Sequence, residues 1–511
     1  MGRLRQDIRY AIRSATRQRW VSLMAILAFA LGIGITTAVF SIFNGVLLAP
    51  LPYPEPAQLV MVYDTQPACA TCPASYPKYI DWKTRNDVFS AMGGSMSASF
   101  VMTGHGQAEQ VDGVKTTASL KDVFGVDPMI GRWYTPQEDE PGGPKVVVLS
   151  YPFWMREFSG DRTAVGTKIV LDGDAYDVIG VMPESFDHRK ASVFVPLQRK
   201  NDPSTRGNHF LVTFARMKPG VPLDRAVNEM RALGVTLAHE YGYNHGIDVQ
   251  SYYEAIVGRI RGSLRVLLGA VIMVLLIAVT NVANLLLASG FSRRRELAIR
   301  LALGANHRDI ARQLTCESLL LALTGGAIGL LLASWTLRVF LALAAGTLPR
   351  ATAIHMDGRV LAFAFGLTML VGVLCGLWPL LRLRLSTLTS TMRDADTRTT
   401  SGAGRFGRGV VIAETALAFA LLVGAGLLIK NLALLEHRNA GINPDHVIAF
   451  DLSPAGPRYK APEASAALYR SVYERLKQVG GVQEVGLISH LPMYRFGWNG
   501  EMTRAGGNPW G

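Results

Sequence analysis

The chain has 511 residues, a formal net charge of +13 and 49% hydrophobic residues. The length allows several domains, and long apolar stretches exclude an ordinary soluble protein. A basic balance also occurs in nucleic-acid-binding proteins, but here the arginines flank apolar stretches instead of forming one basic face with aromatic partners, so nucleic acid is not expected as a partner.

Five apolar stretches are each long enough to cross a bilayer, which requires roughly 20 apolar residues per helix. They are spaced unevenly, because a long polar insert separates the first from the other four. The first is too long for a signal peptide and is interpreted as an uncleaved anchor. The predicted transmembrane helices are Val21–Leu48, Leu264–Ser289, Thr315–Leu343, Val360–Leu381 and Gly409–Leu432.

Arginine clusters beside these stretches predict one orientation, because Lys and Arg next to spans stay cytoplasmic. The clusters lie in residues 1–20, 290–314 and 382–408, whereas the connection between the third and fourth spans carries only two arginines. We therefore expect a cytoplasmic N-terminus, with residues 50–261 and 433–511 outside. Residues 1–20 are either an amphipathic interfacial helix or a plain basic flank.

The insert at residues 50–261 is predicted to be an α+β domain. Short β-branched runs bounded by Gly, Pro or Asp indicate strands, and they show no βαβ regularity. Helices are predicted at Tyr76–Thr84, Pro152–Phe158 and Leu223–Tyr241. The predicted strands are Leu59–Tyr63, Val111–Thr117, Lys145–Leu149, Thr167–Leu171, Tyr176–Val181 and Phe210–Arg216.

The insert shows no spacing typical of a catalytic, cofactor or metal site. Its histidines are scattered, without an H-x-x-x-H or H-E-x-x-H pair, and we expect ordinary surface and core roles for them. The four considered are His188, His209, His239 and His245.

The cysteines allow several interpretations. Cys69 and Cys72 form a C-x-x-C in the insert. A disulfide is plausible in an oxidising compartment, with inert thiols, a metal site and a redox site as alternatives. Cys316 and Cys375 fall in predicted spans, where packing is the expected role.

Polar side chains within the spans are few, namely Asn281, Asn284, Glu317 and Glu414. Intramembrane acids are costly and often functional. Both glutamates, however, lie near the cytoplasmic ends and beside arginines, so a buried ion pair or a snorkelling side chain is the alternative to a proton or ion pathway. A pathway requires acids near the midplane of several helices, and the sequence has none there.

The sharpest motif is the amphipathic run at residues 292–305, which Gly304 ends as a helix C-cap. A second short helix, His307–Thr315, is predicted to lead into the third span. Such a pair of cytoplasmic helices can present an apolar face to a groove on a soluble partner. The alternative is a membrane-surface helix that only anchors the loop.

The run R-R-R-E-L-A-I-R-L-A-L-G-A at residues 293–305, with T-C-E-S-L-L-L-A at 315–322, resembles the core motif of FtsX/MacB-type permeases of ABC transporters. Residues 7–11, 31–34 and 47–54 are similar to the large acidobacterial-type duplicated permeases of that superfamily. The resemblance covers nearly the whole chain, and the insert has the position of the MacB-like periplasmic core domain.

The resemblance implies a permease subunit of the bacterial inner membrane that couples to a separate ABC ATPase. ATP and Mg²⁺ then belong to that ATPase, and no cofactor or enzymatic activity is expected here, since the sequence contains no G-x-x-x-x-G-K-[ST]. It further implies a homodimer or pseudo-dimer, a periplasmic adaptor as a candidate partner, and handling of a lipid, lipoprotein, peptide or antibiotic. The implied coupling residues are Arg294, Arg295, Glu296, Leu297, Gly304 and Ala305.

The fifth span departs from the four-span plan of MacB-type permeases. We interpret it as the start of a second copy, with a helix at Leu468–Val479 and a strand at Val482–Ile488 in an incomplete second external domain, and we expect a truncated member of the duplicated type. The alternative function is a membrane-anchored sensor or scaffold that recruits extracytoplasmic partners without an ATPase. A membrane enzyme is disfavoured by the lack of a clustered catalytic set.

Overall fold

The computed structural model describes residues 2–67, 69–104, 107–291, 307–343, 350, 353–390, 402–436, 446–450, 452, 454, 457–459 and 461–488. The chain divides into two compact units. One is helical and comprises Met1–Ala49 and Val257–Val447. The other carries the sheet and comprises Pro50–Ile256 and Ile448–Gly511.

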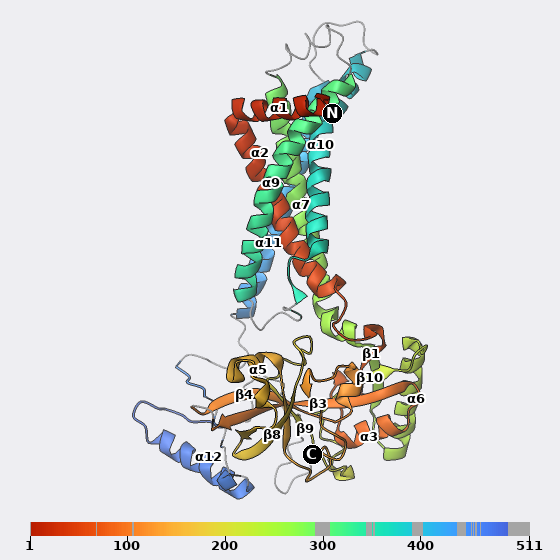
Figure 1. Cartoon of the computed structure of the whole chain (residues 1–511), viewed down its shortest axis with the longest axis vertical. Helices are drawn as coiled ribbons and strands as arrows, with labels where there is room; N and C mark the ends of the chain where they lie inside the picture. Colours follow the sequence, from red (N-terminus) through yellow and green to blue (C-terminus); the bar gives the residue numbers. More distant parts are fainter. Residues whose placement is uncertain are drawn as a thin grey trace. The chain divides into compact units, whose positions relative to one another are not determined.

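Five long helices of the helical unit each contain a segment long and apolar enough to cross a membrane, as the sequence predicts. They run side by side (Figure 1), and a shorter basic helix, α1 (Gly2–Arg17), precedes them. The long helices are α2 (Arg19–Phe43, continued by a π-helical turn at Asn44–Leu48), α7 (Tyr252–Phe291), α9 (His307–Leu343), α10 (Gly358–Ser390) and α11 (Gly402–Glu436).

One prediction about these helices is wrong. His307–Thr315 is not a separate short helix, because α9 runs without interruption from His307 to Leu343. The residues around Thr315 include no Gly or Pro that would end a helix.

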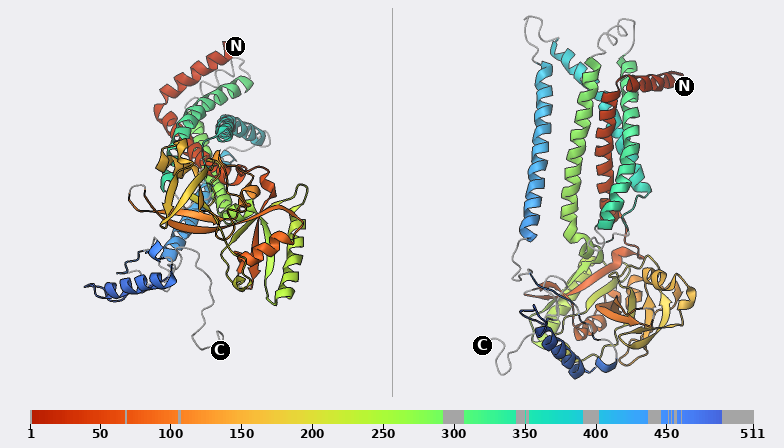
Figure 2. Two further views of the ribbon diagram at one scale, coloured as in Figure 1. Left: turned by 60° about the horizontal axis from the view of Figure 1, so that its bottom comes forward. Right: turned by 90° about the vertical axis from the view of Figure 1, so that its left-hand side faces the viewer.

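Helices α2 and α9 pack through glycines. A Cβ atom at Gly329 would lie 2.8 Å from the carbonyl oxygen of Ala30, and one at Gly34 would lie 2.9 Å from that of Gly329. Small residues permit this close approach of membrane helices. In α11, by contrast, the apolar span Val411–Leu434 is not buried against the rest of the described chain (Figure 2).

The second unit is built around an 11-stranded mixed sheet with the order β11-β1-β10-β3-β4-β9-β6-β8-β5, where β2 pairs with β1 and β7 with β3 and β8. The pairs β4–β9 and β6–β8 are parallel and the others antiparallel. The strands are β1 (Leu59–Gln66), β2 (Cys69–Cys72), β3 (Phe89–Thr103), β4 (Glu109–Thr116), β5 (Ile130–Gly131), β6 (Val146–Leu149), β7 (Lys168–Leu171), β8 (Asp174–Val181), β9 (Val193–Pro196), β10 (Val212–Met217) and β11 (Gly246–Ser251).

Helices cover parts of this sheet, which confirms the predicted α+β class (Figure 1). The α-helices are α3 (Tyr76–Thr84), α4 (Leu120–Phe124), α5 (Tyr151–Phe158) and α6 (Leu223–Tyr241). Short 3₁₀ turns lie at Pro56–Gln58, Arg162–Ala164 and Pro203–Thr205.

Strand β1 shows how the cores are divided, because successive strand side chains point to opposite faces. Val60 and Val62 join the core formed with α3 and α6, which includes Trp82 and Met230. Leu59 points the other way, into a core rich in aromatic residues. Complete burial of a valine or leucine side chain stabilises the fold by about 1.5–3 kcal/mol.

The C-terminal segment contains α12 (Pro462–Lys477) and a 3₁₀ turn at Pro457–Tyr459. The helix predicted there is present, although it begins six residues before Leu468. The predicted strand Val482–Ile488 is wrong, because residues 482–488 have no regular structure. No neighbouring strand pairs with them in the described part of the chain, and a strand without a partner has no hydrogen-bond ladder.

Candidate functional site

The predicted coupling residues lie outside the described residues, so their role stays a prediction. They are Arg294, Arg295, Glu296, Leu297, Gly304 and Ala305, and they fall between α7, which ends at Phe291, and α9, which begins at His307. What the structure describes is how α9 contacts the other helices.

The start of α9 is held by the N-terminal helix. The Ser14 hydroxyl of α1 donates a hydrogen bond to the Glu317 carboxylate of α9. Ser14 is buried, as is Ala11 on the same basic helix. Of the four polar residues predicted in spans, Glu317 is thus engaged with α1, within three turns of the beginning of α9.

The other three lie on α7 and α11. Asn281 of α7 is exposed and Asn284 half-buried, and Glu414 of α11 is half-buried. The role of Glu414 stays a prediction.

The opposite end of α2 is tied to the segment before α10. The Arg350 guanidinium donates to the carbonyl oxygens of Val46 and Ala49, each at 2.8 Å. Asn44, which opens the π-helical turn, donates from Nδ2 to Asp357 Oδ2 at 3.1 Å. The two bonds from Arg350 satisfy carbonyls that the end of a helix leaves without partners.

A cluster of titratable side chains lies in the sheet-containing unit, centred on Asp64. Asp64 follows Val60 and Val62 with a period of two, so β1 directs it to the same face, towards α3. A carboxylate on this buried, apolar face needs a cation or several hydrogen-bond donors beside it, because burying an unpaired charge is costly.

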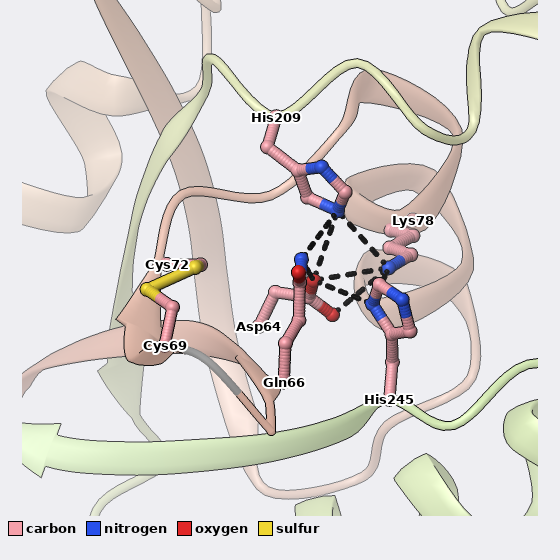
Figure 3. The surroundings of a disulfide bond; sticks show 7 residues. All are labelled: Asp64, Gln66, Cys69, Cys72, Lys78, His209 and His245. Carbon is pink, nitrogen blue, oxygen red and sulfur yellow. Dashed lines mark hydrogen bonds and ion pairs between the residues drawn. A yellow bond between two sulfur atoms is a disulfide. The ribbon is translucent and has the colours of Figure 1, made fainter. Parts of the chain in front are cut away.

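The Asp64 carboxylate is surrounded by donors (Figure 3). Lys78 Nζ of α3 lies 3.0 Å from both carboxylate oxygens. His209 Nε2 lies 3.0 Å and His245 Nδ1 2.9 Å from Oδ2, and Gln66 Nε2 donates to the same oxygen at 2.9 Å. Lys78 Nζ is also 2.7 Å from His245 Nδ1 and 3.3 Å from His209 Nε2, so the ammonium group contacts both imidazoles as well as the carboxylate.

Burial sets the electrostatics of this cluster. The side chains of Asp64 and Lys78 are each 2% exposed, those of His209 and His245 13% and 24%. Burial alone would raise the pKa of Asp64, but hydrogen bonds from His209 and Gln66 and the charge of Lys78 outweigh it, and the pKa is lowered. Burial lowers the pKa of Lys78 more than the charge of Asp64 raises it.

A disulfide adjoins the cluster (Figure 3). It joins Cys69 and Cys72 across a four-residue strand, and Cys316 and Cys375 are not part of a disulfide. Strand β2 pairs antiparallel with β1 so that Cys72 lies opposite Asp64 and Cys69 opposite Gln66. The covalent loop therefore sits beside two residues of the cluster.

The expectation that the histidines are scattered is wrong for two of the four. His209 precedes β10 and His245 precedes β11, and both strands pair with β1. The sequence conceals this, because His245 and Asp64 are 181 residues apart. The feature of the sequence that could indicate the cluster is Asp64, an acidic residue at a position of β1 where the alternation of apolar side chains predicts a buried one. His188 is buried elsewhere, and His239 is exposed on α6.

Two family models match the chain. A MacB-like periplasmic core domain matches residues 22–233, and an FtsX-like permease C-terminal domain matches residues 268–387. The chain belongs to the FtsX/MacB-type permeases of ABC transporters. It is a multi-pass membrane protein with an extracytoplasmic domain, from a family of permease components that are usually not catalytic themselves.

Two similar proteins are identical to this chain at somewhat more than a quarter of the aligned positions. The pyoverdine export ATP-binding/permease protein PvdT of Pseudomonas syringae pv. tomato is 26% identical over 271 residues, which are 49% of this chain and 39% of that protein. The macrolide export ATP-binding/permease protein MacB of Chromobacterium violaceum is 29% identical over 232 residues, 44% of this chain and 34% of that protein. The chain thus matches little more than a third of the length of these relatives.

Among solved structures, the periplasmic region of MacB from Actinobacillus actinomycetemcomitans is similar, with 13% identity and a TM-score of 0.32, covering 42% of this chain and 97% of that one.

Proposed function

We propose that this chain is the transmembrane subunit of an ABC system in which a separate ATPase subunit drives movements of the extracytoplasmic domain. The observation that carries the proposal is the presence of both family domains on one chain, in the order core domain and then FtsX-like permease. The amphipathic segment at residues 293–305 lies between α7 and α9, within the permease match.

The ATPase docks on the cytoplasmic segment 290–314, with Leu297 in the apolar face of the contact and Arg294 and Glu296 at its rim. ATP and Mg²⁺ are bound by that subunit. Closure of the ATPase on ATP displaces the segment and with it the start of α9. The N-terminus is cytoplasmic, and the membrane is the bacterial inner membrane.

Close packing then carries the displacement through the helical unit. Helix α9 contacts α1 through Ser14 and Glu317, and α2 through Gly34 and Gly329. These contacts leave no free space between the helices, and protein interiors are nearly incompressible. A displacement of α9 therefore also displaces α1 and α2. Helix α7 is continuous from Tyr252, directly after β11, through the second span to Phe291.

The work is done outside the membrane, so the substrate need not cross the bilayer. The absence of acids near the midplane of the sequence's spans supports this mode over a proton-driven pathway. The substrate class is a lipid, lipoprotein, peptide or antibiotic. Assembly as a homodimer or pseudo-dimer, with a periplasmic adaptor, belongs to the same proposal.

Co-purification tests the docking step. The full chain is captured from native membranes, and proteins with ABC-type nucleotide-binding motifs are identified by mass spectrometry, together with the ATPase activity of the complex. We expect wild type to recover such a subunit and Leu297→Glu to lose it. Thr399→Glu, which adds the same charge in the cytoplasmic linker 382–408, should retain it. Recovery of no ATPase by wild type, or equal recovery by Leu297→Glu, would contradict the proposal and favour a scaffold without an ATPase.

A further inference from the structure

We propose that Asp64, His209 and His245 form a binding site for one divalent first-row transition metal ion, and that the Lys78 ammonium is the cation that occupies it when no metal is bound. This site is independent of the proposed ATPase coupling.

The ligand atoms already have nearly the required spacing. One carboxylate oxygen and one nitrogen from each imidazole lie within 4.8 Å of one another. Bonds of about 2.0–2.2 Å to a common ion require ligand atoms no more than roughly 4 Å apart. His209 Nε2 and His245 Nδ1 lie 3.0 and 2.9 Å from Asp64 Oδ2, so only small side-chain rotations are needed.

The backbone fixes where each ligand begins. Asp64 is within β1, opposite Ile247 of β11 and Cys72 of β2. His245 directly precedes Gly246, which pairs with Thr65. His209 lies two residues before Leu211, whose amide donates to Ala74 at 2.9 Å. Ligands on or directly beside paired strands are better ordered than ligands on free loops, so the backbone need not rearrange when a metal ion binds.

Lys78 marks the cation position. Its Nζ lies within 3.3 Å of all three candidate ligands, which is an unusual surrounding for an ammonium because two of its neighbours are imidazole nitrogens. A metal ion at this point requires the ammonium group to leave. The Tyr243 ring, whose centroid is 4.7 Å from Nζ, gives the displaced cation a place through a cation–π contact.

The donor set decides which metals fit. Two imidazoles and one carboxylate suit Zn²⁺, Co²⁺, Ni²⁺ and Cu²⁺, whereas Mg²⁺ and Ca²⁺ prefer oxygen alone. The neighbouring sulfurs are joined in the Cys69–Cys72 disulfide, so thiolate ligation is not part of the site. Three protein ligands leave a position for water or an external ligand.

Cobalt titration of the full chain tests the site. The protein is purified in detergent through a tag without histidines, and binding is followed by visible absorption and by metal content after dialysis. We expect wild type to bind one Co²⁺ per chain, and Lys78→Met to bind it at least about tenfold more tightly, because the competing ammonium is gone. His209→Ala and His245→Ala should each lose the spectrum, and His239→Ala, an exposed histidine on α6, should keep it.

Two further variants keep the test decisive. If Lys78→Met does not fold, Lys78→Gln replaces it and should also bind Co²⁺ more tightly than wild type. Cys69→Ser with Cys72→Ser should retain the spectrum, and an intense sulfur-to-cobalt band in wild type would place the metal on the cysteines and overturn the proposal. The proposal is equally overturned if wild type and the folded Lys78 variant bind no more Co²⁺ than His209→Ala; the cluster is then a permanent lysine-centred network.

Discussion

Buried His188 makes the stability of the extracytoplasmic domain depend on pH. Its ring lies among Phe124, Phe186 and Phe214, with centroids 5.2–6.0 Å away, and Nε2 is 3.1 Å from Ser95 Oγ. Nδ1 has no hydrogen-bond partner within the described chain. Burial, and secondarily the charge of a neighbouring arginine, lowers the pKa of His188 from 6.5 to about 3.

The sign and magnitude follow from this shift. Below pH 6.5, His188 binds a proton in the unfolded chain but stays neutral in the folded domain. The free energy of unfolding therefore decreases as the pH falls from 6.5 towards 3. At 1.36 kcal/mol per pKa unit, the loss at a pH of about 4.5 is about 3 kcal/mol. We expect His188→Phe, which removes the titrating group from an aromatic environment, to lack this part of the pH dependence.

Hydrogen–deuterium exchange of β10 amides in the full chain, corrected for intrinsic rates, measures the effect, since β10 carries Phe214 beside His188. Between neutral pH and about pH 4.5, the difference in opening free energy between wild type and His188→Phe should shift by about 3 kcal/mol in favour of the variant. His239→Phe, at an exposed position, should show no such shift. Equal pH dependence of wild type and His188→Phe would refute the reasoning.

Three further changes have defined outcomes, each read as a thermal midpoint of the full chain in detergent. Gly329→Leu should destabilise the helical unit by about 1–3 kcal/mol through overpacking. Gly424→Leu, where an added Cβ meets nothing within 4 Å among the described residues, should have no effect, and equal midpoints of the two variants would contradict the α2–α9 contact. Arg350→Ala should cost about 2 kcal/mol by removing two charged hydrogen bonds, and an unchanged midpoint would show that this tie is not formed. Asp64→Asn should cost about 3–5 kcal/mol because it leaves the Lys78 charge buried without its partner, and a cost below about 1 kcal/mol would indicate that the ion pair is solvated.

Elements with a strong local period could be predicted from the sequence. The helices Tyr76–Thr84 and Leu223–Tyr241 have the bounds that the periodicity indicates. The apolar spans are found too, because bilayer thickness sets a length that composition reveals.

The long strand β3 was not predicted, for a physical reason. Its sequence is rich in Gly, Ser and Ala, which do not indicate a strand. Tertiary packing requires small residues there: a Cβ at Gly93 would lie 2.8 Å from Leu120 Cα, and one at Gly94 2.7 Å from the Leu211 side chain. The small residues are a consequence of neighbours distant in the sequence.

The same limitation applies to the candidate metal site. The C-x-x-C spacing is sufficient to suggest the disulfide between Cys69 and Cys72. Spacing says nothing, however, about which strands pair with β1, and that pairing brings His209 and His245 to Asp64.

The central claim is that an ATPase acting on the segment before α9 moves the extracytoplasmic domain. Hydrogen–deuterium exchange of the purified complex in lipid nanodiscs, without nucleotide and with ATP and vanadate, tests it most directly. We predict that nucleotide changes exchange in the first turns of α9 and at the start of α7 beside β11, and that Leu297→Glu abolishes both changes. A nucleotide response confined to the ATPase subunit, with α7 and the domain unchanged, would contradict the account.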